Sequence, residues 1–133
     1  MTTDEQHLDL LAVFHYIVGG LTGLLACFPL IHVGVGLLFL RGGFEGPNPP
    51  PAVIGWVFVI VGGFFVVCGW LLAAAILVAG RNLKRRRART YCLVVGALEC
   101  MLMPFGTILG VFTLIVLTKE PVQALFEARP GTA

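Results

Sequence analysis

The sequence predicts an all-α integral membrane protein, a helical bundle of three long, kinked transmembrane segments with a short interfacial helix at each end. Three apolar runs, 10–40, 52–80 and 91–118, each exceed the about 20 residues that cross a hydrocarbon core. Hydrophobic residues make up 58% of the 133-residue chain and charged residues 12%, against roughly 25% charged in an average soluble domain. A basic cluster follows the second run, as expected of a cytoplasmic loop. The composition leaves room for a single membrane domain, 1–133, and for no separate soluble domain.

The N-terminal third is too long for one straight crossing, because residues 8–40 would extend about 50 Å as a continuous helix. We expect an interfacial helix start over 4–16, since Asp4 and Glu5 favour a helix N-terminus. The first span then covers 17–40. A bend is expected near Gly19-Gly20 or at Pro29, because proline removes one helical hydrogen bond.

A Gly- and Pro-rich stretch, 41–51, separates the first two runs. It predicts a compact loop on the non-cytoplasmic side, and its last prolines suit the start of the next helix. The second span is predicted over 52–80. A basic loop, 81–89, follows it and is expected to be cytoplasmic by the positive-inside rule.

The basic residues of this loop are Arg81, Lys84, Arg85, Arg86, Arg87 and Arg89. Their expected role is to anchor the topology, and they can also attract anionic lipid headgroups. Nucleic acid is not an expected partner, since the cluster is a short loop between two spans.

The third run, 90–118, contains Pro104-Phe105-Gly106 at its centre. We expect one kinked span, and the alternative is a hairpin reversal that makes four segments in all. A tail over 119–133 follows, with Val122, Leu125 and Phe126 on one face. This pattern predicts an amphipathic helix on the membrane surface.

Glycines recur at helical spacings in all three runs. Gly55, Gly62 and Gly69 are seven residues apart, and the pairs Gly19/Gly23 and Gly106/Gly110 are four apart. Such smooth faces let membrane helices approach closely. The pattern predicts tight packing and leaves open whether it occurs within one chain or between chains.

Several segments carry a resemblance to known proteins: Phe14-His15-Tyr16, the stretch 27–32, and Pro104-Phe105-Gly106-Thr107 followed by Ile108-Leu109-Gly110-Val111-Phe112. Together with the C-terminal tail they resemble a group of small bacterial multi-pass membrane proteins of unassigned function. The resemblance implies the bacterial inner membrane and brings no activity with it.

Three polar residues lie inside apolar runs and are the candidates for chemistry. Glu99 has two interpretations. It is a structural group that is protonated, or paired with a basic residue or with a helix-packing histidine; or it is a site that handles ions or protons. His15 and His32 either form hydrogen bonds between helices or act as an axial ligand for haem iron or chlorophyll magnesium.

No catalytic constellation is present: the chain has no serine, no HExxH sequence and no Walker loop. We expect neither an enzyme nor a metal site nor a resident cofactor. The leading hypothesis is a small accessory membrane protein that packs through its glycine faces into a homo-oligomer or a larger complex. The alternatives are an oligomeric channel or transporter using Glu99 and His32, and a haem- or pigment-binding subunit using His15 or His32.

Overall fold

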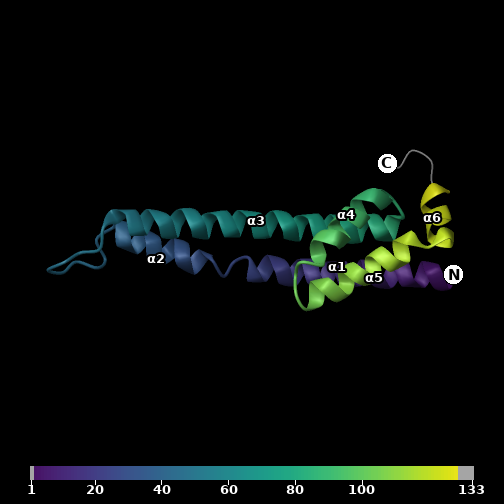
Figure 1. The fold of residues 1–133 in the computed structure, drawn as a ribbon, viewed down its shortest axis with the longest axis horizontal. Coiled ribbons are helices and arrows are strands. Elements are labelled where there is room, and N and C mark those ends of the chain that lie inside the picture. The colour runs from purple at the N-terminus through teal and green to yellow at the C-terminus, as the bar shows by residue number, and fades with distance from the viewer. Residues whose placement is uncertain (1, 129–133) are drawn as a thin grey trace. The chain divides into compact units, whose positions relative to one another are not determined.

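The structure, a computed structural model, describes residues 2–128, and these form six helices without a strand. The helices are α1 (Thr3–Leu25), α2 (Leu30–Leu40), α3 (Ala52–Arg85), α4 (Arg89–Glu99), α5 (Phe105–Thr118) and α6 (Glu120–Glu127) (Figure 1). The predicted all-α class is confirmed. By length and composition, Thr3–Leu40 and Ala52–Arg85 can each cross a membrane.

The third apolar run does not form the single kinked span that we expected. It divides into α4 and α5, which are about 16 and 21 Å long and therefore shorter than a hydrocarbon core. The two helices pack against each other as a hairpin, the alternative arrangement for this run. A third crossing exists only if α5 and α6, bent by 77°, count as one segment.

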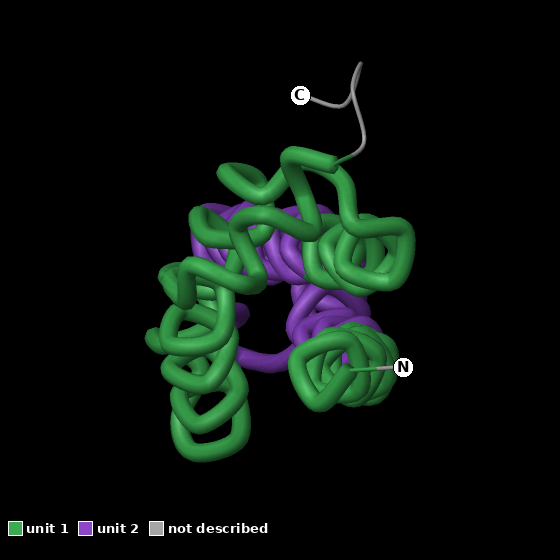
Figure 2. The backbone as a smooth tube through the Cα atoms, turned by 90° about the vertical axis from the view of Figure 1, so that its right-hand side faces the viewer, with its two compact units in different colours: residues 1–21, 73–133 green, residues 22–72 purple. Residues whose placement is uncertain are grey.

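The chain divides into two compact units, which are described separately here (Figure 2). Unit 1 comprises residues 1–21 and 73–133, and unit 2 comprises residues 22–72. Helices α1 and α3 each contribute a segment to both units.

In unit 2, α2 runs antiparallel to the first part of α3. A Cβ atom added to Gly36 would lie 2.7 Å from the carbonyl oxygen of Gly55, and one added to Gly62 would lie 3.0 Å from that of Pro29. One added to Gly69 would lie 2.5 Å from the Cβ atom of Ala26. The predicted glycine face of α3 is therefore occupied by contacts within the chain.

The glycine pair Gly19/Gly23, predicted as one packing face of the first span, is divided between the two units. Gly19 belongs to unit 1, where a Cβ atom added to it would lie 2.8 Å from Leu77 Cδ2 of α3. Gly23 belongs to unit 2 and is half-buried, and its carbonyl oxygen accepts a hydrogen bond from the Cys27 thiol over 3.4 Å. This bond of Gly23 is made at the end of its own helix and not to a second helix. Helix packing through Gly23 therefore stays a prediction.

The first long segment is interrupted at residues 26–29, which end with Pro29, and α1 continues unbroken past Gly19-Gly20. Pro29 has no N–H to donate, so the helical ladder is interrupted there. At the other end of α2, Gly42 adopts a left-handed φ of 76°, which ends the helix before the 41–51 loop.

Unit 1 begins with a capping box at the start of α1. The Glu5 N–H donates to Thr2 Oγ1 over 3.3 Å, and the Thr2 N–H donates to Glu5 Oε2 over 2.8 Å. These reciprocal bonds satisfy backbone donors that the first helical turn leaves without partners. The helix starts as predicted and continues to Leu25, and the interfacial position of its first part stays a prediction.

The predicted basic loop 81–89 is mostly helical, because α3 continues to Arg85. Arg86 and Ala88 take left-handed φ angles of 51° and 48°, and the chain turns into α4 within residues 86–88. Arg81, Lys84 and Arg85 therefore project from the C-terminal turns of α3, where cations interact favourably with the helix dipole.

The hairpin of α4 and α5 is packed through glycines. A Cβ atom added to Gly96 would lie 3.1 Å from Thr113 Cγ2, and one added to Gly110 would meet the Gly96 carbonyl oxygen. Pro104 lies in the connection, where it interrupts the helix and allows the reversal.

The apolar face of the predicted surface tail is used differently from our expectation. Val122 and Phe126 of α6 are buried within the protein, with exposed fractions of 0% and 6%. This face therefore packs on the protein and not on the membrane surface. The remainder of the predicted tail, residues 129–133, lies outside the described residues.

Candidate functional site: a buried histidine–glutamate pair

Unit 1 brings together two of the three predicted polar candidates. His15 lies on α1, and Glu99 is the last residue of α4. Their Nε2 and Oε2 atoms are 3.2 Å apart, and both side chains are fully buried. The pair thus joins two helices that are distant in sequence, in the interior of unit 1.

Glycines make room for the pair. A Cβ atom added to Gly80 of α3 would lie 3.0 Å from the Cβ atom of His15 and 3.1 Å from the Ala12 carbonyl oxygen. One turn further along α1, Gly19 makes the close contact with Leu77 described above. Because neither glycine has a side chain, α1 can pack closely against α3 at the level of His15.

A backbone hydrogen bond assigns the tautomer of His15. Its Nδ1 atom is 2.8 Å from the carbonyl oxygen of Leu11. A carbonyl oxygen can only accept, so Nδ1 carries the hydrogen and donates it. The neutral ring therefore presents Nε2 as an acceptor toward Glu99.

This tautomer places an acceptor opposite the carboxyl group. An ionised Glu99 and a neutral His15 would put two acceptors 3.2 Å apart in a buried, low-dielectric setting, which is repulsive. A proton on the Glu99 carboxyl or on His15 Nε2 would remove this repulsion.

Few other polar groups reach the pair. Among the described residues, no further side chain or backbone group donates a hydrogen bond to either carboxyl oxygen of Glu99. Thr113, also fully buried, donates its hydroxyl to the Leu109 carbonyl oxygen over 2.7 Å. Glu99 therefore depends on His15 for its polar contact.

His32, the third candidate, belongs to unit 2. It is exposed on α2, and its ring stacks on Phe58 with 5.9 Å between centroids. Sequence reasoning placed His15 and His32 together as similar groups, yet the first is paired and buried and the second is neither.

Metal binding finds little support in these positions. Among residues 2–128 no three His, Cys, Asp or Glu side chains are grouped as a metal site requires. Nδ1 of His15 is bonded to the Leu11 carbonyl oxygen and Nε2 faces Glu99 Oε2 at 3.2 Å, so coordination of iron or magnesium would require one of these arrangements to change. A cofactor-ligand role would then fall to His32.

The charged residues of unit 1 are connected at the N-terminal end of α1. Arg86 Nη2 lies 3.5 Å from Glu5 Oε1, and Lys119 Nζ lies 4.0 Å from Asp4 Oδ1. Arg89 Nε donates to the Leu117 carbonyl oxygen over 2.8 Å, which brings the start of α4 to the end of α5. The basic turn therefore lies at the same end of unit 1 as the first turn of α1.

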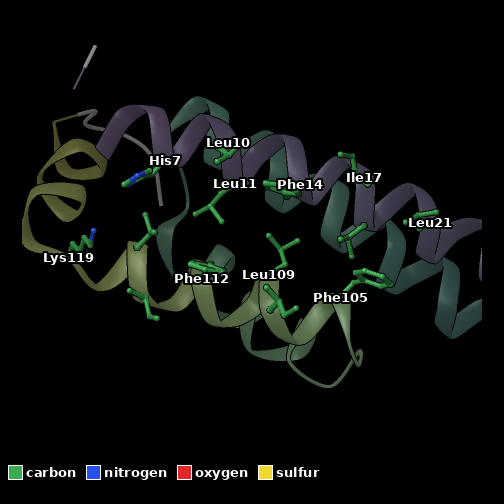
Figure 3. A pocket seen from close by; sticks show the side chains of 14 residues that line it. His7, Leu10, Leu11, Phe14, Ile17, Leu21, Phe105, Leu109, Phe112 and Lys119 are labelled. Atoms are coloured by element: carbon green, nitrogen blue, oxygen red, sulfur yellow. The ribbon is translucent and has the colours of Figure 1, made fainter. Parts of the chain in front are cut away.

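An apolar groove of about 650 Å³, which sequence reasoning did not identify, lies between α1 and α5 in unit 1 (Figure 3). It extends along α1 from His7 to Leu21 and along α5 from Phe105 to Val116, with Lys119 at its end. His7 and Lys119 lie at one end, and Leu21 and Phe105 at the other (Figure 3). The helical spacing of apolar residues was visible in each run, but nothing local indicated that the two runs face one groove.

Comparison with known proteins adds no further information: no protein-family model matches this chain, and neither a curated protein nor a solved structure is similar to it.

Proposed function

We propose that this chain is a small accessory protein of the bacterial inner membrane that assembles, through helix packing, into a homo-oligomer or a larger membrane complex. The hypothesis from sequence assigned assembly to the glycine face of Gly55, Gly62 and Gly69. These glycines contact α2 and Ala26 within the same chain. Assembly must therefore use another face.

The proposal is based on one exposed face of α3. Trp56, Ile60, Gly63, Val67 and Trp70 alternate at spacings of four and three residues, which places them on one side of the helix. We call this the Gly63 face. Its four large side chains are 50–64% exposed, and a Cβ atom added to Gly63 would meet nothing within 4 Å.

This face has the features of a contact surface between membrane helices. A glycine with free space above it lets a second backbone approach, and its large neighbours can interlock with side chains of a partner helix. The 3.5-residue spacing suits the left-handed crossing that is common among membrane helices.

The test compares two glycine substitutions in unit 2. Gly63→Leu should leave the fold intact and abolish co-purification of a partner or self-association after gentle extraction from the native membrane, measured by native mass spectrometry. The control is Gly34→Leu on α2, where an added Cβ atom also meets nothing within 4 Å. Unchanged assembly in Gly63→Leu would contradict the proposal.

A second candidate function is proton-coupled transport, and the His15–Glu99 pair favours it. The pair places a carboxyl group and an imidazole next to each other in the interior of the unit, and intramembrane ionisable groups are typical of proton pathways. Glu99→Gln separates this function from a structural role. Its amide can donate to His15 Nε2 and keep the two helices joined, but it cannot release a proton.

The measurement for this candidate is proton flux in liposomes that contain the purified protein. Transport by the parent protein that is lost in Glu99→Gln, with helical content unchanged, would support it. A parent protein that carries no flux would leave the pair with a structural role alone.

A further inference from the structure

The groove between α1 and α5 has a lining unlike the helix contacts elsewhere in the chain. Apart from His7 and Lys119, it is lined by leucine, isoleucine, valine and phenylalanine, without a glycine, alanine or threonine. Membrane helices associate through small residues that let backbones approach. The closest helix contacts in unit 1 follow this rule, with glycine at positions 19, 80, 96 and 110.

The lining therefore suits a flexible hydrocarbon chain better than a second helix. Ile108, Phe112 and Ile115 of α5 are 52–57% exposed, and Leu10 and Ile17 of α1 are 50–55% exposed. These branched and aromatic side chains hold the two helix backbones apart and leave an irregular apolar channel between them (Figure 3).

The length of the groove matches the depth of one leaflet. From His7 to Leu21, α1 rises about 21 Å, and half of a hydrocarbon core is about 15 Å. With its polar end at the membrane surface, the groove reaches the bilayer centre. An acyl chain would be covered along its full length.

The polar end carries cations, two of which are paired with carboxylates. Lys119 is 45% exposed, and its carboxylate partner, Asp4, is at the limiting distance of 4.0 Å. His7 is exposed beside it, and the basic turn with Arg86 lies at the same end of unit 1, beside Glu5. An anionic headgroup at this position would find ammonium and imidazole donors within the groove and additional cations next to it.

We propose that the groove binds one anionic phospholipid, with an acyl chain between α1 and α5 and the phosphate at Lys119 and His7. The site is in unit 1 and the Gly63 face is in unit 2, so failure of one proposal leaves the other standing.

The test is native mass spectrometry of the full-length protein in detergent with added dioleoyl phosphatidylglycerol or dioleoyl phosphatidylcholine, which differ only in the headgroup. The parent protein should retain one phosphatidylglycerol at a collision energy that removes phosphatidylcholine. Ile108→Trp fills the groove and should abolish retention. The matched control is Val111→Trp, at a position on α5 that is 44% exposed and does not line the groove.

A headgroup variant tests the polar end independently. Lys119→Gln should lower the preference for phosphatidylglycerol over phosphatidylcholine about fivefold, which corresponds to about 1 kcal/mol for one basic residue at an anionic surface. This side chain is exposed, so the variant provides a test even if Ile108→Trp does not fold.

Three results would overturn the proposal. Equal retention of the two lipids by the parent protein would remove the headgroup preference. Full retention by folded Ile108→Trp would place the lipid elsewhere. A co-purified protein, or a second 14.3 kDa chain, that is lost in Ile108→Trp but not in Val111→Trp would make the groove a protein interface.

Discussion

A double-substitution cycle on His15 and Glu99 tests whether the two buried side chains stabilise the fold as a pair. Both side chains are fully buried with 3.2 Å between Nε2 and Oε2. Replacing His15 with Leu removes the polar partner of Glu99 and leaves its carboxyl group in an apolar interior. Replacing Glu99 with Leu leaves Nε2 of His15 without a donor.

The expected magnitudes follow from the cost of an unsatisfied buried polar group, about 1–3 kcal/mol. We expect each single Leu substitution to lower the free energy of unfolding by about 2 kcal/mol. The double Leu variant leaves no unpaired polar atom and has similar side-chain volume, so it should lose only about 1 kcal/mol. The double loss would thus fall about 3 kcal/mol short of additivity, at the upper end of measured couplings between contacting residues.

Glu99→Gln is the conservative member of the series. The glutamine amide can donate to Nε2 as a protonated carboxyl does, so this variant should lose less than about 1 kcal/mol. The assay is reversible unfolding in mixed dodecylmaltoside–SDS micelles, followed by the helical circular dichroism of each variant. Single effects that add within about 0.5 kcal/mol in the double variant would refute the pairing.

Two further predictions concern helix packing. Gly62→Leu should destabilise unit 2 by about 1–3 kcal/mol, because a side chain there would press on the Pro29 carbonyl oxygen, 3.0 Å from the added Cβ atom. Its neighbour Gly63 is open, so Gly63→Leu should unfold at the same SDS fraction as the parent, and equal behaviour of the two variants would contradict the packing described here. Tyr91→Phe should cost about 1 kcal/mol, since the Tyr91 hydroxyl donates to the Ala75 carbonyl oxygen over 3.0 Å; an unchanged unfolding midpoint would show that this bond contributes nothing.

The glycine pattern illustrates how far sequence reasoning reached. The heptad spacing of Gly55, Gly62 and Gly69 predicted a smooth, closely packed face, and close contacts do occur along it. The spacing could not identify the partner. Either α2 of the same chain or a helix of another chain requires the same small residues on α3 for close packing. Only the fold distinguishes Gly62, which is covered, from Gly63, which is open.

The shorter glycine spacing in α1 shows the same limit. Gly19 and Gly23 are one helical turn apart, which predicted tight helix packing at both. The fold assigns them to different units, and Gly19 makes its close contact with α3 within unit 1. The spacing of two residues determines whether they share a helix face. How far a neighbouring helix runs along that face depends on the packing of the whole unit.

The candidate site was predictable only in part. Glu99 stood out because a carboxyl group within an apolar run is costly. Its pairing with His15, and the separation of His15 from His32 into different units, depend on how α1 and α4 pack, which no local pattern records. The groove was missed for the same reason, since its two walls come from opposite ends of the chain.

The sequence by itself determined that this chain is helical and has segments apolar enough to cross a membrane, because backbone hydrogen bonds within a helix are local and hydrocarbon admits no alternative partners for them. The tertiary structure alone decided the hairpin at Pro104, the burial of Val122 and Phe126, the tautomer of His15 and the glycines that remain open. Each of these depends on contacts between residues far apart in the chain, whose energies are set by the distance and shape of the packed helices.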